Sequence, residues 1–86
     1  MKTNFLMLKE LLEAYHPKER GFVSYEERRL IEKTLHLNEM DILALRNLRD
    51  FVVAHMSRYD DMENWDRMSA ITYVIDMEIS YQGGIV

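Results

Sequence analysis

The fold is decided by residues 39–82, which read EMDILALRNLRDFVVAHMSRYDDMENWDRMSAITYVIDMEISYQ. Apolar residues recur there every three or four positions, which is the period of an amphipathic helix. The corner at residues 59–61 divides the stretch in two, with Asp60 or Asp61 as the cap of the second helix. We therefore expect one helix over residues 39–57 and another that continues to about residue 82, where Gly83 and Gly84 end it.

Both of these helices carry much apolar surface. On the first, one seam at helical spacing consists of Leu45, Leu48, Val52, Met56 and Tyr59. On the second, the stripe expected in the core consists of Trp65, Met68, Thr72, Ile75 and Ile79. A further stripe on another face consists of Ala70, Val74, Met77 and Tyr81. Because a chain of 86 residues has little material to cover both stripes, we expect this further stripe to be a partner interface. The alternative is that the N-terminal helices cover it and the protein is a monomer.

Two shorter helices are predicted before this stretch. The first covers residues 4–15, with an apolar stripe of Phe5, Leu8, Leu12 and Tyr15 that Leu11 widens. His16-Pro17 ends it, because a residue before proline is pushed out of the helical region. The second begins at Ser24, where Glu27 completes a capping box, and faces inward with Leu30, Ile31, Thr34 and Leu35. Asn38 is the predicted cap of the third helix.

These elements predict an all-α fold in a single domain over residues 1–86. We expect a small antiparallel bundle of four helical segments, in which the two shorter N-terminal helices pack on a long C-terminal helical hairpin. Three glycines and one proline are too few for a many-stranded β fold, and 48% hydrophobic residues exclude disorder. No apolar run is long enough for a secretory signal or a membrane span, so we expect a cytoplasmic protein without a membrane partner.

Catalytic and metal-binding patterns are absent from the sequence. There is no cysteine, and the only serine near a histidine is Ser57, which lies two residues from His55 and so points elsewhere on a helix. A Glu-x-x-His pair occurs once, from Glu13 to His16, whereas a carboxylate-bridged di-iron bundle needs two such pairs. We therefore expect no enzyme activity, no metal and no cofactor.

The charges argue against nucleic-acid binding, and they leave the function of one acidic corner undecided. The formal net charge is −4, and the acids Glu39 and Asp41 begin the helix that would read DNA if residues 24–53 formed a helix-turn-helix. The most negative corner consists of Asp60, Asp61, Glu63 and Asp66. It lacks the glycine and glutamate of a calcium loop. It either caps and solvates the last helix or docks on a basic partner.

A protein–protein interaction module is the function that this sequence favours. Seven methionines suit a surface that receives another protein, although ordinary core filling also explains them. The single tryptophan, Trp65, is either a core anchor or an exposed hot spot. In general style the chain resembles small helical proteins carried by bacteria and their phages, many of which bind and inhibit a host protein. We expect a regulator or inhibitor that forms a homodimer. The alternatives are a helix-turn-helix-like DNA-associated regulator and an acidic phage-type anti-defence inhibitor that blocks a nucleic-acid-binding protein.

Overall fold

The computed structural model describes residues 3–19, 21–56 and 62–84, and every regular element within them is helical. The four α-helices are α1 (Asn4–Ala14), α2 (Tyr25–Leu35), α3 (Ile42–Met56) and α4 (Met62–Tyr81), and one turn of 3₁₀ helix, η1, covers Leu37–Glu39. The predicted all-α class is therefore confirmed. None of the helices within these ranges is long and apolar enough to cross a membrane.

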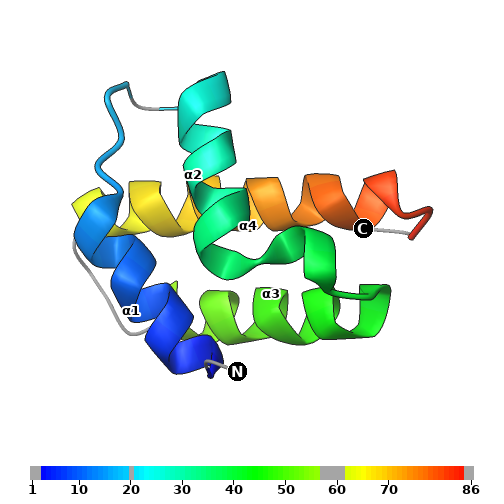
Figure 1. Ribbon diagram of the computed structural model, residues 1–86. Helices are drawn as coiled ribbons and strands as arrows, with labels where there is room; N and C mark the ends of the chain where they lie inside the picture. The colour runs from blue at the N-terminus through cyan, green and yellow to red at the C-terminus, as the bar shows by residue number, and fades with distance from the viewer. Residues whose placement is uncertain (1–2, 20, 57–61, 85–86) are drawn as a thin grey trace.

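The helices form a compact body in which α3 and α4 lie side by side with opposite chain directions (Figure 1). In the same view α1 packs near one end of this pair, and α2 crosses α4 steeply instead of running along it. The helices span only 11, 11, 15 and 20 residues in chain order. The finer prediction, a regular antiparallel bundle built on a long hairpin, therefore stays a prediction.

Local signals set most of the helix ends. The predicted capping box is present, since the Glu27 amide donates to Ser24 Oγ and the Ser24 amide donates to Glu27 Oε1, both at 3.2 Å. At the other end of the chain Gly83 has a φ of +87°, and its amide and that of Gly84 donate to the carbonyls of Ser80 and Ile79. This is the Schellman arrangement that closes many helices, and glycine takes its left-handed position without strain.

The start of α3 differs from the prediction. His36 has a left-handed φ of 55°, and residues 37–39 form the 3₁₀ turn. The α-helix begins only at Ile42, and Asp41 caps it by accepting a hydrogen bond of 2.8 Å from the Ala44 amide. The predicted cap at Asn38 is wrong because Leu37 is fully buried, and the 3₁₀ turn carries this side chain into the core before the chain turns into α3.

One apolar core joins all four helices and η1. Its completely buried members include Leu11 from α1, Ile31 from α2, Leu37 from η1, Leu48 from α3 and Ile75 from α4. The seam of α3 is confirmed for Leu45, Leu48 and Val52. Three residues predicted to face the core are exposed instead, because Phe5, Leu30 and Trp65 are 57%, 36% and 46% exposed. The core-anchor interpretation of Trp65 is therefore wrong.

Candidate functional site

Exposed aromatic side chains gather along the outer surface of α4. Tyr73 and Tyr81 of α4 are 55% and 79% exposed, and Phe22, in the connection between α1 and α2, is 56% exposed. Phe22 and Tyr73 line one depression, and Tyr73, Met77 and Tyr81 line a second, more open one. Because Tyr73 belongs to both, the two depressions form one continuous surface. We call Phe22, Tyr73, Met77 and Tyr81 the aromatic face.

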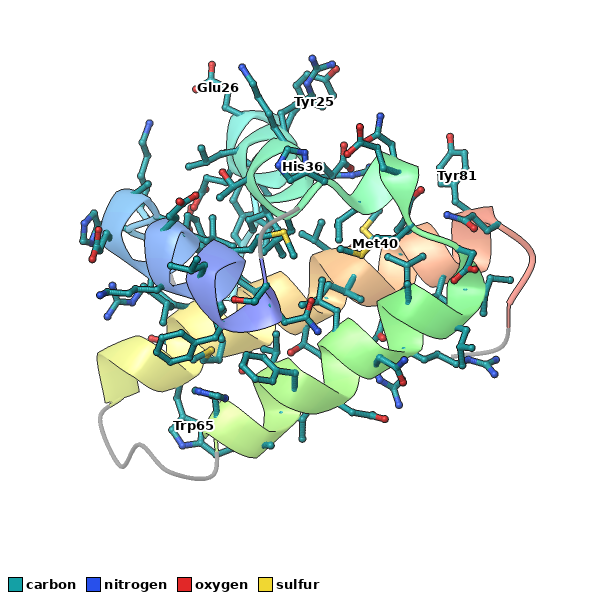
Figure 2. All side chains as sticks on the ribbon, turned by 60° about the horizontal axis from the view of Figure 1, so that its bottom comes forward. Tyr25, Glu26, His36, Met40, Trp65 and Tyr81 are labelled. Atoms are coloured by element: carbon teal, nitrogen blue, oxygen red, sulfur yellow. The ribbon has the colours of Figure 1, made fainter. Side chains whose placement is uncertain are left out.

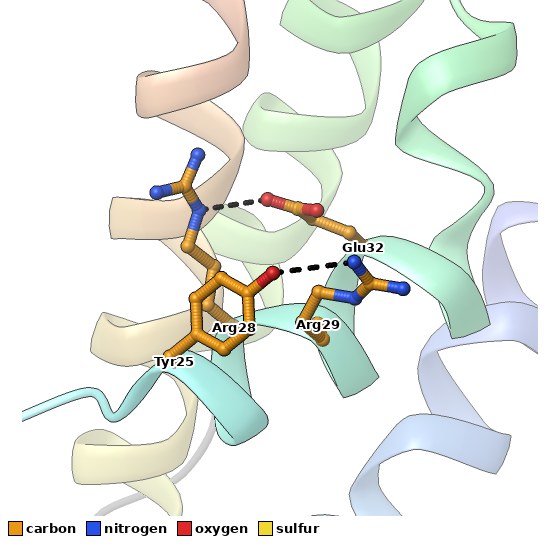
Figure 3. Close-up of polar contacts among 4 residues, drawn as sticks. All are labelled: Tyr25, Arg28, Arg29 and Glu32. Carbon is orange, nitrogen blue, oxygen red and sulfur yellow. Dashed lines mark hydrogen bonds and ion pairs between the residues drawn. The ribbon is translucent and has the colours of Figure 1, made fainter.

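Arg28 of α2 is paired within its own helix. Its Nε donates a hydrogen bond of 2.7 Å to Glu32 Oε1, one helical turn further on, and both side chains are about two-thirds buried (Figure 3). The hydrogen bond that Arg28 donates to Glu32 raises the pKa of Arg28, and the negative charge of Glu32 adds to this effect against that of burial. Arg28 is therefore a charged guanidinium that its ion pair holds in one orientation on α2.

A second arginine orders the neighbouring tyrosine of α2. Arg29 Nη1 donates to the Tyr25 hydroxyl at 3.3 Å, and the guanidinium carbon lies 5.9 Å from the centre of the Tyr25 ring (Figure 3). Tyr25 is 70% exposed. Figure 2 shows Tyr25 and Tyr81 on the same side of the molecule and Trp65 on the other side. Tyr25 is therefore a further exposed aromatic residue on the side of the molecule that carries Tyr81, and Trp65 does not share that side.

The other flank of α4 is tied to α3. Arg49 Nη1 donates to Asp76 Oδ1 at 3.3 Å, between side chains that are 32% and 27% exposed. At the far end of α4, Gln82 Nε2 donates to the carbonyl of Met40 at 2.8 Å, which joins α4 to the segment before α3. These contacts fix α4 in rotation, so the exposed side chains of the aromatic face stand on a braced helix.

A buried polar pair lies beneath the loop that carries Phe22. The Tyr15 hydroxyl and Glu27 Oε2 are both buried without a hydrogen bond of ordinary length, yet each acts on the pKa of the other. Burial and the charge of Glu27 raise the pKa of Tyr15, so this phenol stays neutral. Burial opposes ionisation of Glu27, but its hydrogen bonds, chiefly those with Ser24 and to a smaller extent those from Tyr15 and the Lys18 backbone, outweigh this effect and lower its pKa. This carboxylate anchors the start of α2.

The structure separates the four residues of the predicted interface. Tyr81 is highly exposed, and Met77, which is half-buried, lies with it on the aromatic face. Ala70 packs against the core and also lines the depression beside Phe22. Val74 is only 1% exposed and belongs to the core, so its assignment to an exposed stripe is corrected. The apolar spacing could not distinguish this position from its exposed neighbours, because the helices that pack on α4 decide which of its sides is buried.

Sequence reasoning missed Phe22 and Tyr73 as members of this surface. Tyr73 is the residue before Val74, and its side chain takes the outward position that the prediction gave to Val74.

The predicted acidic corner is described at one residue only. Asp60 and Asp61 lie outside the described residues, as does the side chain of Glu63. Asp66 is half-buried and lines the same depression as Phe22 and Tyr73. The corner as a docking element therefore stays a prediction, with Asp66 placed next to the aromatic face.

The titratable side chains that the structure describes do not assemble into a metal site. Among residues 3–19, 21–56 and 62–84 no three histidine, aspartate or glutamate side chains could hold a metal ion together. Glu13 and His16 are both exposed. His36 Nδ1 lies 3.3 Å from Glu39 Oε2. The ring centroid of His55 lies 4.4 Å from that of Phe51.

Comparison of the chain with protein-family models, with curated proteins and with solved structures found no match. What the fold and the aromatic face define is a small all-helical protein with a braced, tyrosine-rich surface along one helix.

Proposed function

We propose that this chain is a non-enzymatic protein–protein interaction module, a small regulator or inhibitor that binds a partner protein through the aromatic face. The observation that carries the proposal is the gathering of Phe22, Tyr73 and Tyr81, each more than half exposed, on one continuous surface. An exposed aromatic side chain contributes little hydrophobic stabilisation, and burying it under a partner protein is favourable.

The composition of the surface supports the same proposal. Tyrosine, phenylalanine, methionine and arginine are the residue types enriched at protein interfaces, and tyrosine and arginine dominate their hot spots. Tyrosine contributes a large contact area with few rotatable bonds, so its ordering costs little entropy. The ion pairs of Arg28 with Glu32 and of Arg49 with Asp76 order both flanks before binding. A surface ordered in advance costs less to immobilise in a complex.

The same proposal includes two further points. The protein forms a homodimer, and it acts in the cytoplasm of a prokaryotic or phage-infected cell. The homodimer is supported by the presence of both positive and negative charges around the aromatic face, since a twofold interface must be complementary to itself. Arg28 and Arg29 belong to α2, and Asp66 and Asp76 line the two depressions of the face.

The test is a photo-crosslinking capture from a bacterial lysate. A photoreactive phenylalanine analogue replaces Tyr73 or Tyr81 in separate variants and, as a matched control, Leu43, an exposed residue of α3 that is 69% accessible. The proposal predicts one defined protein, or a second copy of the chain, crosslinked from positions 73 and 81 but not from position 43. Equal crosslinking from all three positions, or none from 73 and 81, would contradict it.

A further inference from the structure

The part of the aromatic face that belongs to α4 is a symmetric row of side chains. Tyr73, Met77 and Tyr81 follow one another at intervals of four residues, so they lie along one side of the helix with the methionine midway between two tyrosines. We call these three residues the tyrosine row. We propose that a second copy of the chain covers this row, with its α4 antiparallel to that of the first copy and a twofold axis beside Met77. The inference rests on the proposed function and adds the geometry of the homodimer to it.

The order of side chains in the row makes it complementary to itself. A twofold axis beside Met77 brings the two methionines together and places Tyr73 of each copy against Tyr81 of the other. The tyrosines are 55% and 79% exposed, whereas Met77 is half-buried between them. The flexible methionines then fill the centre of the contact and pack against the tyrosine rings. Antiparallel packing also keeps the two negative C-terminal ends of the helices apart, whereas parallel packing would bring them together.

The centre of this contact carries no unpaired charge. Of the described residues that line the depression around Met77, only Asp76 is charged, and it lies 3.3 Å from Arg49 of α3 in an ion pair. Each chain has a formal charge of −4, so two copies repel each other in most orientations. The repulsion is weakest where a surface without net charge meets its equal. The tyrosine row is such a surface, and it offers no counter-charge to a strongly basic or acidic partner.

Both flanks of the tyrosine row combine an acid of α4 with a base of a neighbouring helix. Residues 76 and 78 precede and follow Met77 by one position, so they point about 100° to either side of it. On one flank Arg49 of α3 donates to Asp76. On the other flank Glu78 lines a depression together with Lys33 of α2. A second copy therefore adds an acid and a base to each flank, and neither flank accumulates charge of one sign.

The experiment is disulfide trapping of the full chain, which has no cysteine of its own. Met77→Cys places one thiol beside the twofold axis, so mild oxidation should join two copies of this variant. Tyr73→Cys and Tyr81→Cys should not form disulfides with themselves, because like positions then lie about 12 Å apart along the helices, beyond the reach of a disulfide. An equimolar mixture of these two variants should form the mixed disulfide.

Leu43→Cys on α3 is the matched control. Leu43 is 69% exposed and Met77 is half-buried, so random collisions favour the control. Met77→Cys should nevertheless be oxidised to the dimer about tenfold faster at the same concentration, because the contact raises the effective concentration of its thiols. Circular dichroism confirms that each variant is folded.

Two results would overturn the inference. Oxidation of Met77→Cys no faster than that of Leu43→Cys would show that no second copy covers the row. Disulfides of Tyr73→Cys with itself and of Tyr81→Cys with itself, without preference for the mixed product, would show a parallel pairing of the helices.

The outcome also distinguishes this inference from the proposed function. If photo-crosslinking from Tyr73 and Tyr81 captures a different protein while Met77→Cys remains monomeric, the inference fails and the proposed function stands. If Met77→Cys is trapped as predicted in the concentrated chain, but positions 73, 81 and 43 crosslink equally in the dilute lysate, the twofold contact is real and the proposed function is wrong.

Discussion

Tyr73 and Val74 are consecutive residues of α4 that face opposite environments. Tyr73 is 55% exposed on the aromatic face, and Val74 is 1% exposed in the core. The pair marks the line along α4 at which the core of the chain ends and its proposed binding surface begins. Substitutions on the two sides of this line should therefore have different consequences.

Val74→Asp should unfold or severely destabilise the chain, because it buries a carboxylate without a counter-charge. The expected loss is about 3–5 kcal/mol in the free energy of unfolding. Tyr73→Asp introduces the same group one residue away and should change that free energy by no more than about 0.5 kcal/mol, since its site is exposed. Urea denaturation followed by circular dichroism measures both. Comparable stability of the two variants would contradict the boundary between core and face.

Ser24→Ala should destabilise the chain through the start of α2. The substitution removes the hydroxyl that accepts the Glu27 amide and leaves that donor without its cap. The expected cost is about 0.5–2 kcal/mol. Ser80→Ala, at an exposed position of α4, serves as the control and should be close to neutral. A cost no larger than that of the control would show that the capping box does not stabilise α2.

Glu27 should make the stability of the chain depend on acidic pH. Hydrogen bonds from Ser24 lower the pKa of this carboxyl below its ordinary value of 4.5, against the effect of burial. A lowered pKa in the folded state means that the stabilisation is complete above the ordinary value and is lost as the pH falls through the folded value. The urea midpoint of the wild type should therefore be higher than that of Glu27→Gln at pH 7. This difference between the two proteins should be smaller at pH 3. Glu26→Gln, at an exposed neighbouring position, is the control. A pH-independent difference between wild type and Glu27→Gln would refute this linkage.

Self-association through the aromatic face should depend on Tyr81. If the chain dimerises through this face, Tyr81→Asp places two carboxylates near the twofold contact and should weaken the dimer, while Leu43→Asp on α3 should not. Sedimentation equilibrium over a range of concentrations measures both. A wild-type chain that remains monomeric at millimolar concentration would leave another protein as the only partner to consider.

The helix ends show what local sequence predicts well. Ser24 with Glu27, Pro17 after α1 and Gly83 after α4 each act within a few residues of their position, and the corresponding ends were predicted close to where they lie. The start of α3 was misplaced because Asn38 is a good cap by residue type. Its neighbour Leu37 is needed in the core, and that requirement comes from the tertiary structure.

The surface shows what a single sequence leaves undecided. Apolar spacing put Val74 and Tyr81 on one stripe of α4, whereas the packed helices bury the first in the core and leave the second exposed. Periodicity likewise assigned Trp65 to the core, although the packed helices leave it 46% exposed. Which side of a two-sided helix meets solvent depends on the crossing of its neighbours, and residue spacing does not encode that geometry.

The most direct test of the central claim is the affinity of the crosslinked partner, or of the second copy, for wild type and for Tyr73→Ala. If the aromatic face is the binding surface, this truncation should raise the Kd about 30-fold, the effect of a hot-spot residue of about 2 kcal/mol, without lowering the melting temperature. Leu43→Ala should leave the Kd unchanged. An unchanged Kd for Tyr73→Ala, in a chain that remains folded, would contradict the account.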